Sequence, residues 1–262
     1  MNMALYRHEM KMNAKSLCLW SLCVGLMCFG CMLLYSSLEE SIQGIADSFS
    51  DLGAMSTALG MDKMSLATLT GYYATEITMM HGLGGAMFAA ILGTGLLSKE
   101  ESAHTTEFLN VLPTNRRKII LSKYLALVSN VLLLNIFCMA LYCLGFVVMG
   151  EEMNRQEMLL YHAAACFMQL EIGTICFFLS ACARRITIGL GLGVTILLFA
   201  CDMMCRIVPA IEGLSYVTPF YYANAADIFT EGEINGVMLA IGAGILIFAY
   251  VAAWLIYEKK DL

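Results

Sequence analysis

Six long apolar runs constrain the fold of this chain more than any other feature of its sequence. A helix that crosses a membrane needs about 20 mostly apolar residues. Runs of this kind cover residues 16–36, 72–97, 119–149, 158–182, 186–208 and 237–257. They recur along all 262 residues and leave no room for a separate soluble domain. We therefore predict an all-α membrane protein, with six transmembrane helices in a single domain over residues 1–262.

The composition agrees with this class and excludes others. Apolar residues make up 60% of the chain and charged residues 14%, against about 25% charged residues in a typical soluble domain. A soluble fold could not cover so much apolar surface with so few charges. The net charge of −6 argues against a nucleic-acid partner. All 11 cysteines lie in apolar runs, so we predict neither a disulfide framework nor a metal site.

The distribution of basic residues predicts the orientation in the membrane, because loops that face the cytoplasm carry an excess of Lys and Arg. Of the 15 such residues, all but three fall on one side of the predicted spans: Arg7, Lys11, Lys15, Lys99, Arg116, Arg117, Lys118, Lys123, Arg184, Arg185, Lys259 and Lys260. The other side has Lys63, Arg155 and Arg206. Both termini are therefore predicted to be cytoplasmic, with residues 37–71 and 209–236 on the outer side.

Three segments outside the spans have patterns of their own. Residues 1–15 mix apolar and basic side chains, which is typical of a helix lying in the inner membrane interface. An apolar stripe at helical spacing predicts an amphipathic helix in the outer segment 37–71. The stripe consists of Leu38, Ile42, Ile45, Phe49 and Leu52. The outer segment 209–236 is too short to cross the membrane twice, so we expect a re-entrant-like hairpin before the last span.

The inner segment 98–118 reads SKEESAHTTEFLNVLPTNRRK and predicts a short helix that faces the cytoplasm. Thr105 or Thr106 would cap this helix. The helix would contain Glu107, Phe108, Leu109 and Leu112, and Pro113 would follow it. Exposed apolar side chains rimmed by charges usually mark a surface for a partner. We therefore expect a docking surface in this segment. The alternative is a loop that packs on its own bundle.

Polar residues inside the apolar runs are costly in a membrane and are candidates for function. They are Glu76, His81, Gln169, Glu171, Asp202 and Arg206. Asp202 and Arg206 are four residues apart on one predicted helix, so they can pair locally. Glu171 lies near mid-membrane with no opposite charge in reach on its own helix. It must therefore find a partner elsewhere, line a polar cavity or be neutral. A structural bond and a place in a transport pathway both remain open for it.

The order of these features resembles the permease subunits of ABC-2 type transporters. Such permeases usually carry an acid, a Thr-Glu-Phe-Leu-like stretch, a Leu-Pro step, a basic residue and a Ser-Lys pair. The matching residues are Glu100, Glu101, Thr106, Glu107, Phe108, Leu109, Leu112, Pro113, Arg116, Ser122 and Lys123. LSYVTPF at residues 214–220 and the terminal EKKDL also resemble the outer hairpin and tail of the family. His104 departs from the family, which often has glycine before the threonine pair.

The resemblance implies a transport subunit and not an enzyme. ATP and Mg²⁺ would bind to a separate cytoplasmic ATP-binding subunit, and no cofactor would bind to this chain, which has no GxxxxGK[ST] motif. Two permeases, identical or sister chains, would pair in the plasma membrane of a prokaryote. Each would dock one ATP-binding subunit through a coupling helix, here roughly Glu100 to Arg116. As substrate we favour a small amphiphile, peptide or antibiotic that is exported.

Two other classes also fit six spans. An ion channel or a secondary transporter would have the same number of helices but would not require an exposed coupling helix. A six-span intramembrane hydrolase could use His81 and His162 as bases or ligands. However, Glu151, Glu152 and Arg155 fall one residue short of an EExxxR motif and lie in a predicted outer loop. We therefore keep the channel or secondary transporter as the main alternative.

Overall fold

The computed structural model describes residues 2–50, 53–103 and 115–260, and within these ranges the chain forms helices and no strands. Six described segments are long and apolar enough to cross a membrane: Met3–Leu38, Leu69–Leu96, Arg116–Met149, Arg155–Cys182, Ile188–Ile207 and Gly236–Lys259. They match the six predicted runs in number and in order. The predicted class, an all-α membrane protein with six spans, is therefore confirmed.

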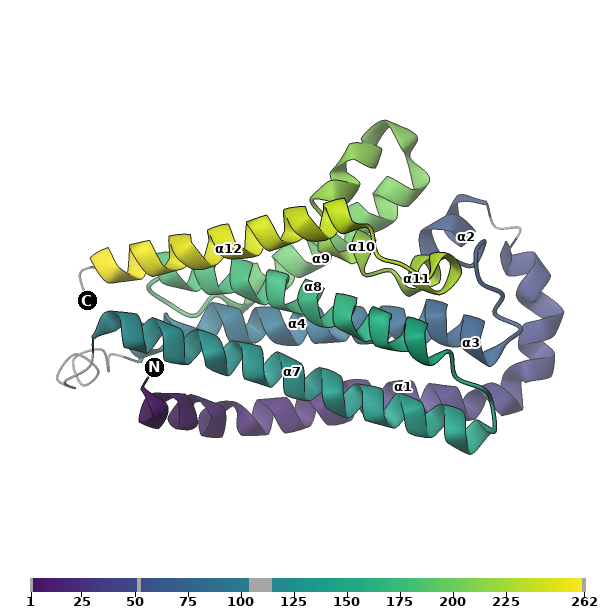
Figure 1. The fold of residues 1–262 in the computed structure, drawn as a ribbon, viewed down its shortest axis with the longest axis horizontal. Coiled ribbons are helices and arrows are strands. Elements are labelled where there is room, and N and C mark those ends of the chain that lie inside the picture. Colours follow the sequence, from purple (N-terminus) through teal and green to yellow (C-terminus); the bar gives the residue numbers. More distant parts are fainter. Residues whose placement is uncertain (1, 51–52, 104–114, 261–262) are drawn as a thin grey trace.

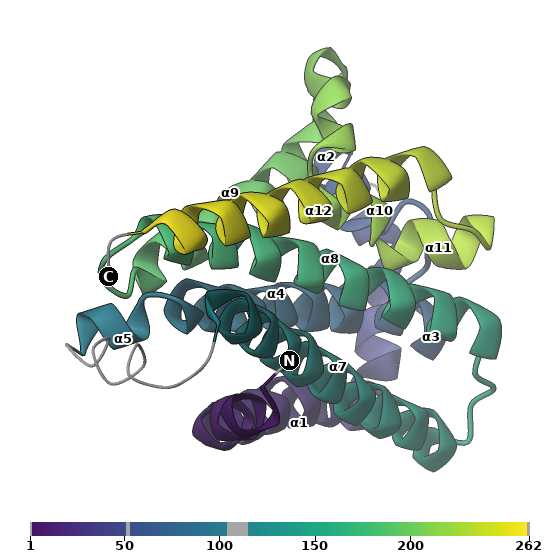
Figure 2. The same cartoon turned by 60° about the vertical axis from the view of Figure 1, so that its left-hand side comes forward.

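The long helices form one bundle (Figure 1, Figure 2). They are α1 (Met3–Ser50), α4 (Thr78–Leu96), α7 (Arg116–Met149), α8 (Arg155–Cys182), α9 (Ile188–Ile207) and α12 (Gly236–Lys259). Helix α4 packs mainly against α8 and also against α9, while α1 packs along α7 and α12 along α8. Both chain termini lie at the same end of the bundle, which we call the terminal end. We call the opposite end, with residues 53–68 and 208–235, the loop end.

The shorter elements lie mostly at the two ends. They are α2 (Ala54–Leu59), α3 (Leu69–Tyr72), the π-helix η1 (Tyr73–Ile77), α5 (Lys99–Ser102), the 3₁₀ helix η2 (Pro209–Tyr216), α10 (Pro219–Tyr222) and α11 (Ala225–Glu231). Side chains cap several helices: Asn115 accepts from Arg117 N–H at the start of α7, and Asn235 accepts from Val237 N–H at the start of α12. These caps satisfy backbone donors that a helix start leaves open.

Helix α1 is continuous where the sequence predicted an interfacial helix, a span and a separate amphipathic helix. The expected breaks near residues 15 and 37 are absent. Proline is the residue that reliably stops a helix. The three prolines of the chain are Pro113, Pro209 and Pro219, so none lies within α1. The first turns of α1 pack beside the start of α7, where the Asn2 N–H donates to Ser122 Oγ at 2.9 Å and the hydroxyls of Tyr6 and Ser129 are 2.8 Å apart.

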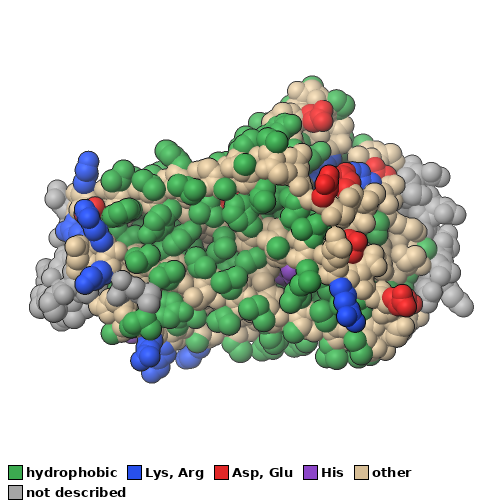
Figure 3. Space-filling model, in the orientation of Figure 1, with side chains coloured by type: hydrophobic (Ala, Val, Ile, Leu, Met, Phe, Trp, Pro, Cys, Tyr) green, Lys and Arg blue, Asp and Glu red, His purple; other side chains and the backbone are tan. Residues whose placement is uncertain are grey.

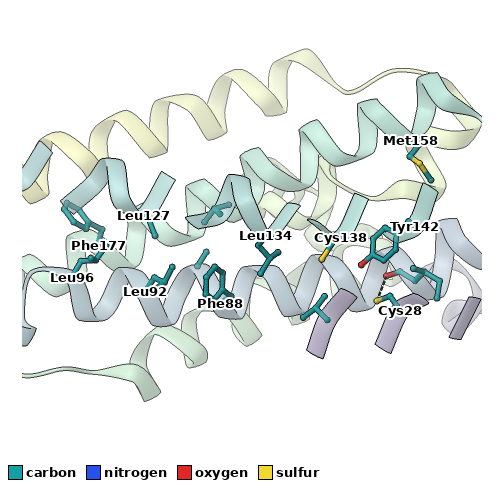
Figure 4. Packing of buried hydrophobic residues seen from close by; sticks show 14 of the residues in the cluster. Cys28, Phe88, Leu92, Leu96, Leu127, Leu134, Cys138, Tyr142, Met158 and Phe177 are labelled. Atoms are coloured by element: carbon teal, nitrogen blue, oxygen red, sulfur yellow. Dashed lines mark hydrogen bonds between the residues drawn. The ribbon is translucent and has the colours of Figure 1, made fainter. Parts of the chain in front are cut away.

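The surface agrees with a membrane-spanning bundle. Figure 3 shows apolar side chains along the middle of the molecule, with Lys and Arg gathered at the terminal end and acidic side chains mainly at the loop end. Exposed large apolar residues such as Ile136, Val147, Leu197 and Phe248 would contact lipid. The interior is packed by apolar side chains from several helices, among them Phe88, Leu134 and Phe177 (Figure 4).

Close packing of α4 on α8 depends on Gly93. A Cβ atom at this position would lie 2.8 Å from Cys176 Cβ, and the carbonyl oxygen of Gly173 would be closer still. Backbone cannot move aside as a flexible side chain can. Small residues allow such close approach between membrane helices.

We expect Gly93→Ala to destabilise the fold by about 1–3 kcal/mol, the usual cost of overpacking. Gly95→Ala is the matched control, because an added Cβ there meets nothing within 4 Å, and alanine favours helix over glycine. Thermal unfolding in one detergent compares the two variants. Equal midpoints for Gly93→Ala and Gly95→Ala would contradict this packing.

The segment after α9 folds back along that helix. The Thr218 hydroxyl donates to the Leu198 carbonyl at 2.9 Å, and Leu198 lies nine residues before the end of α9, which is roughly 14 Å along the helix axis. Helix α10 then contacts α8, α9 and α12. A re-entrant hairpin would follow the same path. How far this hairpin enters the membrane stays a prediction.

Candidate functional site

The segment predicted to dock a partner begins with α5, at the terminal end. The structure describes Glu100, Glu101 and Arg116 among the predicted docking residues. The others, Thr105, Thr106, Glu107, Phe108, Leu109, Leu112 and Pro113, lie outside the described residues. What the structure shows is therefore how the two ends of segment 98–118 are attached to the bundle.

The first attachment is a group of four charged side chains, which we call the Lys123 cluster: Glu9 and Lys123 are buried, and Lys99 and Glu100 are partly exposed. Lys123 is fully buried, and its Nζ donates to the Leu96 carbonyl at 2.6 Å and to the Glu100 carboxylate. The same Nζ lies 3.2 Å from Glu9 Oε1, and Lys99 pairs with the other Glu9 oxygen. Two carboxylates and two ammonium groups balance each other, as buried charges must.

This cluster joins four helices at one point. Glu9 comes from α1, Leu96 from α4, Glu100 from α5 and Lys123 from α7. Ser122, the neighbour of Lys123, is buried as well and accepts a hydrogen bond from the Asn2 N–H. The Ser-Lys pair that the sequence matched to a family motif thus fixes the start of segment 98–118 to α1 and α7.

The second attachment is to the C-terminal end of α12. Glu101 pairs with Lys260 at 2.5 Å, and Lys260 Nζ donates to the Ala183 carbonyl at 2.7 Å. At the other end of the segment, Arg116 donates to the carbonyls of Glu258 and Lys260 at 3.0 and 2.7 Å. Both ends of the segment are therefore bonded to the tail of α12, and its start is also bonded to the Lys123 cluster.

These bonds involve three of the predicted docking residues. Glu100, Glu101 and Arg116 were expected to contribute to a partner surface, whereas the structure shows them bonded within the chain. The sequence could not reveal these bonds, because Glu9, Lys123 and Lys260 are far from the three residues along the chain. The docking role of the three residues stays a prediction.

At the loop end, Asp202 and Arg206 form the local pair that their spacing predicted, with Arg206 Nε 3.1 Å from Asp202 Oδ1. The pair belongs to a larger network. Arg206 also pairs with Asp227 at 2.9 Å and lies 4.3 Å from the ring centre of Tyr221. Lys63 pairs with Asp227 at 2.9 Å, and this hydrogen bond is the main reason why the pKa of Lys63 is raised. The network ties α9, α11 and the 53–68 loop together.

Glu171 finds its partner in the folded-back segment. It is almost fully buried in α8, and its Oε2 accepts a hydrogen bond from the Tyr222 hydroxyl at 2.8 Å. Helix α12 comes close at Gly242, where an added Cβ would lie 2.6 Å from Glu171 Oε2. Among the described residues Glu171 forms no ion pair. The contact supports a structural bond between α8 and α10.

We expect Glu171→Leu to lower stability by about 1–3 kcal/mol, because the buried Tyr222 hydroxyl would lose its acceptor. Glu171→Gln keeps an amide oxygen in the same place and should unfold close to the wild-type temperature. Thermal unfolding in detergent checks both variants. Equal losses for Gln and Leu would show that the Tyr222 hydrogen bond is not what the carboxylate contributes.

Two buried histidines, the candidate His81 on α4 and His162 on α8, lie beside each other and beside Tyr142 of α7. His81 Nδ1 is 3.0 Å from the Tyr161 hydroxyl, and His162 Nε2 is 3.1 Å from the Tyr73 hydroxyl. The π-helix η1 carries both Tyr73 and Glu76, and insertions of this kind are frequent at functional sites. The sequence pattern contained no signal for η1, nor for the pairing of the two histidines with tyrosines from other helices.

Gln169 is buried and lies between α7 and α4. Its Oε1 accepts a hydrogen bond from Asn135 Nδ2 at 2.7 Å. A Cβ added at Gly85 would overlap the Gln169 amide, so the glycine leaves the space that this side chain occupies. Among the described residues, no group of three or more His, Cys, Asp and Glu side chains could hold a metal ion.

A family model described as ABC-2 family transporter protein matches residues 3–262. No curated protein matches the chain.

Proposed function

This chain belongs to the ABC-2 family of transporter proteins, and we propose that two such permeases, identical or sister chains, form the membrane pathway of an ATP-driven exporter. The chain is the membrane-spanning transport subunit. In this proposal ATP and Mg²⁺ bind to separate cytoplasmic subunits, one of which docks on each permease. Membership of the family over nearly the whole chain supports the permease assignment, and the lack of a GxxxxGK[ST] motif agrees with an ATPase on another chain.

The attachment of segment 98–118 is the observation that carries the mechanism. In the proposed cycle, ATP binding brings the two ATP-binding subunits together and moves the segment on which each is docked. Glu100 is bonded to Lys123 on α7, and Glu101 and Arg116 are bonded to the end of α12. A displacement of the segment would therefore move several spans at the terminal end as one body, as a change between inward- and outward-facing states requires.

The orientation follows from the charges. Lys and Arg gather at the terminal end (Figure 3), and such an excess marks the cytoplasmic side. We place the terminal end in the cytoplasm and the loop end outside, in the plasma membrane of a prokaryote. In this orientation the Arg206 network lies on the outer side, and the segment that folds back along α9 enters the outer leaflet beside it.

Mild-detergent copurification from the native membrane tests this proposal. We expect an ATP-binding subunit to copurify with the permease in a two-to-two complex, and subunit identification will show whether the second permease is identical. Recovery of the chain without any ATP-binding subunit, in every detergent that keeps it folded, would contradict the proposal. An ion channel or secondary transporter would then be the better interpretation.

A further inference from the structure

The loop end contains a polar cavity of about 560 Å³ between η2, α10, α11 and the start of α12 (Figure 1). This volume is in the range of small-molecule sites. The charged side chains of its lining are four carboxylates and one amine: Glu212, Asp227, Glu231, Glu233 and Lys63. Three of the carboxylates are exposed, so the cavity is open to solvent. In the proposed orientation a solute on the outer side of the membrane can reach it.

The negative charge of this cavity is only partly balanced within the chain. Lys63 pairs with Asp227 at 2.9 Å and lies 3.8 Å from Glu231. Glu212 and Glu233 form no ion pair among the described residues. A cleft lined by an excess of one charge attracts ions of the opposite charge. The cavity therefore favours a cationic ligand.

A buried serine gives a second and independent indication of a ligand. Ser215 lines the cavity, is 2% exposed and forms no hydrogen bond with the described residues. Its Oγ is not among the polar atoms that the fold encloses completely, so a group in the cavity can reach it. A hydroxyl oxygen accepts hydrogen bonds from an ammonium group. A ligand with such a donor would recover the free energy that the unpaired hydroxyl costs.

Aromatic rings in the same wall suit an ammonium ion that carries alkyl groups. The guanidinium group of Arg206 already lies 4.3 Å from the ring centre of Tyr221. Tyr216 and Tyr222 also line the cavity. The Tyr222 hydroxyl donates to Glu171, which holds its ring in place. Cations bind to the faces of such rings, and alkyl segments pack against them.

The acidic groups do not converge on one point, because no group of three or more His, Cys, Asp and Glu side chains in the described part of the chain could hold a metal ion. A ligand that uses several of the carboxylates must therefore be extended. We propose that this cavity binds a linear organic polycation from the outer side. Its ammonium groups pair with Glu212 and Glu233, one of them donates to Ser215 Oγ, and its alkyl segments lie on Tyr216. The inference does not depend on ATP-driven export, because binding is measured without nucleotide.

Isothermal titration calorimetry of the full chain in phosphatidylcholine nanodiscs tests this site, because a zwitterionic bilayer does not itself attract the probe. The probe is spermine, a linear tetraamine. We expect one site per chain, and an affinity on the order of tenfold lower after Glu212→Gln with Glu233→Gln, since two charge pairs are lost. The matched control is Glu151→Gln with Glu152→Gln. It removes the same charge from exposed residues outside the cavity and should leave the affinity unchanged.

Ser215→Ala separates a built site from general attraction by an acidic surface. It should weaken spermine binding about threefold, the usual effect of one hydrogen bond. The unfolding midpoint should stay at the wild-type value, because the hydroxyl bonds nothing in the fold. No heat of spermine binding to the wild type would overturn the proposal. Equal affinities of the two double variants, or wild-type affinity of Ser215→Ala, would mean diffuse charge attraction only and would overturn it too.

Discussion

Lys123→Met is expected to destabilise the folded chain by about 3–5 kcal/mol, the cost of removing one partner from a buried ion pair. The substitution leaves Glu9 buried beside Lys99 alone and removes the donors to Glu100 and to the Leu96 carbonyl. Methionine has a similar length, so the loss reports on charge more than on packing. Thermal unfolding in detergent should show a midpoint lower by on the order of 10 °C.

Lys118→Met is the matched control for this prediction. Lys118 is on the same helix, is exposed and forms no ion pair among the described residues, so its replacement should shift the midpoint little. Adding Glu9→Gln to Lys123→Met should recover part of the loss, because it removes the carboxylate left with one partner. Equal midpoints for Lys118→Met and Lys123→Met would mean that the cluster does not hold the terminal end together.

Phe108→Glu is expected to reduce recovery of the ATP-binding subunit at least about tenfold and to abolish transport-coupled stimulation of its ATPase. Phe108 lies outside the described residues, and the expectation comes from its place in the predicted coupling helix. Buried aromatic anchors carry much of the binding energy of an interface, and a carboxylate in their place is left without a partner. Quantitative pull-down from membranes and an ATPase assay measure the two effects.

The control for Phe108→Glu is Met55→Glu, which places the same charge on an exposed residue of the loop end. Both variants should reach the membrane in wild-type amounts, and Met55→Glu should keep the ATP-binding subunit. An undiminished pull-down by Phe108→Glu would contradict the coupling-helix assignment. A loss with both variants would point to a general defect of the fold.

The sequence predicted the spans well because their signal is local. Each apolar run is visible within about 20 residues, and the predicted bounds at 119–149 and 158–182 are within three residues of α7 and α8. The pairing of Asp202 with Arg206 could also be predicted from the sequence, since it depends only on a spacing of four residues on one helix. The continuous α1 was missed because an apolar stripe marks where a helix is amphipathic and not where it ends.

The hydrogen-bond and ion-pair partners of the polar residues could not be predicted from the sequence. Glu171 bonds Tyr222, Gln169 bonds Asn135, and Lys123 bonds Glu9 and Glu100. Each bond joins residues from different helices, so it depends on which helices are neighbours and on their rotation. A pattern along the sequence shows neither which helices are neighbours nor how each helix is rotated about its axis. The same reason explains why the sequence did not show that Glu100 pairs with Lys123 of α7 and that Glu101 pairs with Lys260, the residue directly after α12.

We propose that an ATP-binding subunit acts on this bundle through segment 98–118, and site-specific photocrosslinking tests this docking most directly. A photoreactive phenylalanine derivative replaces Leu109 in one variant and Met55, at the loop end, in another, and native membranes are irradiated. We predict a covalent product with the ATP-binding subunit from position 109 and none from position 55. No product from position 109 while the intact complex still copurifies, or a product from position 55, would contradict the claim.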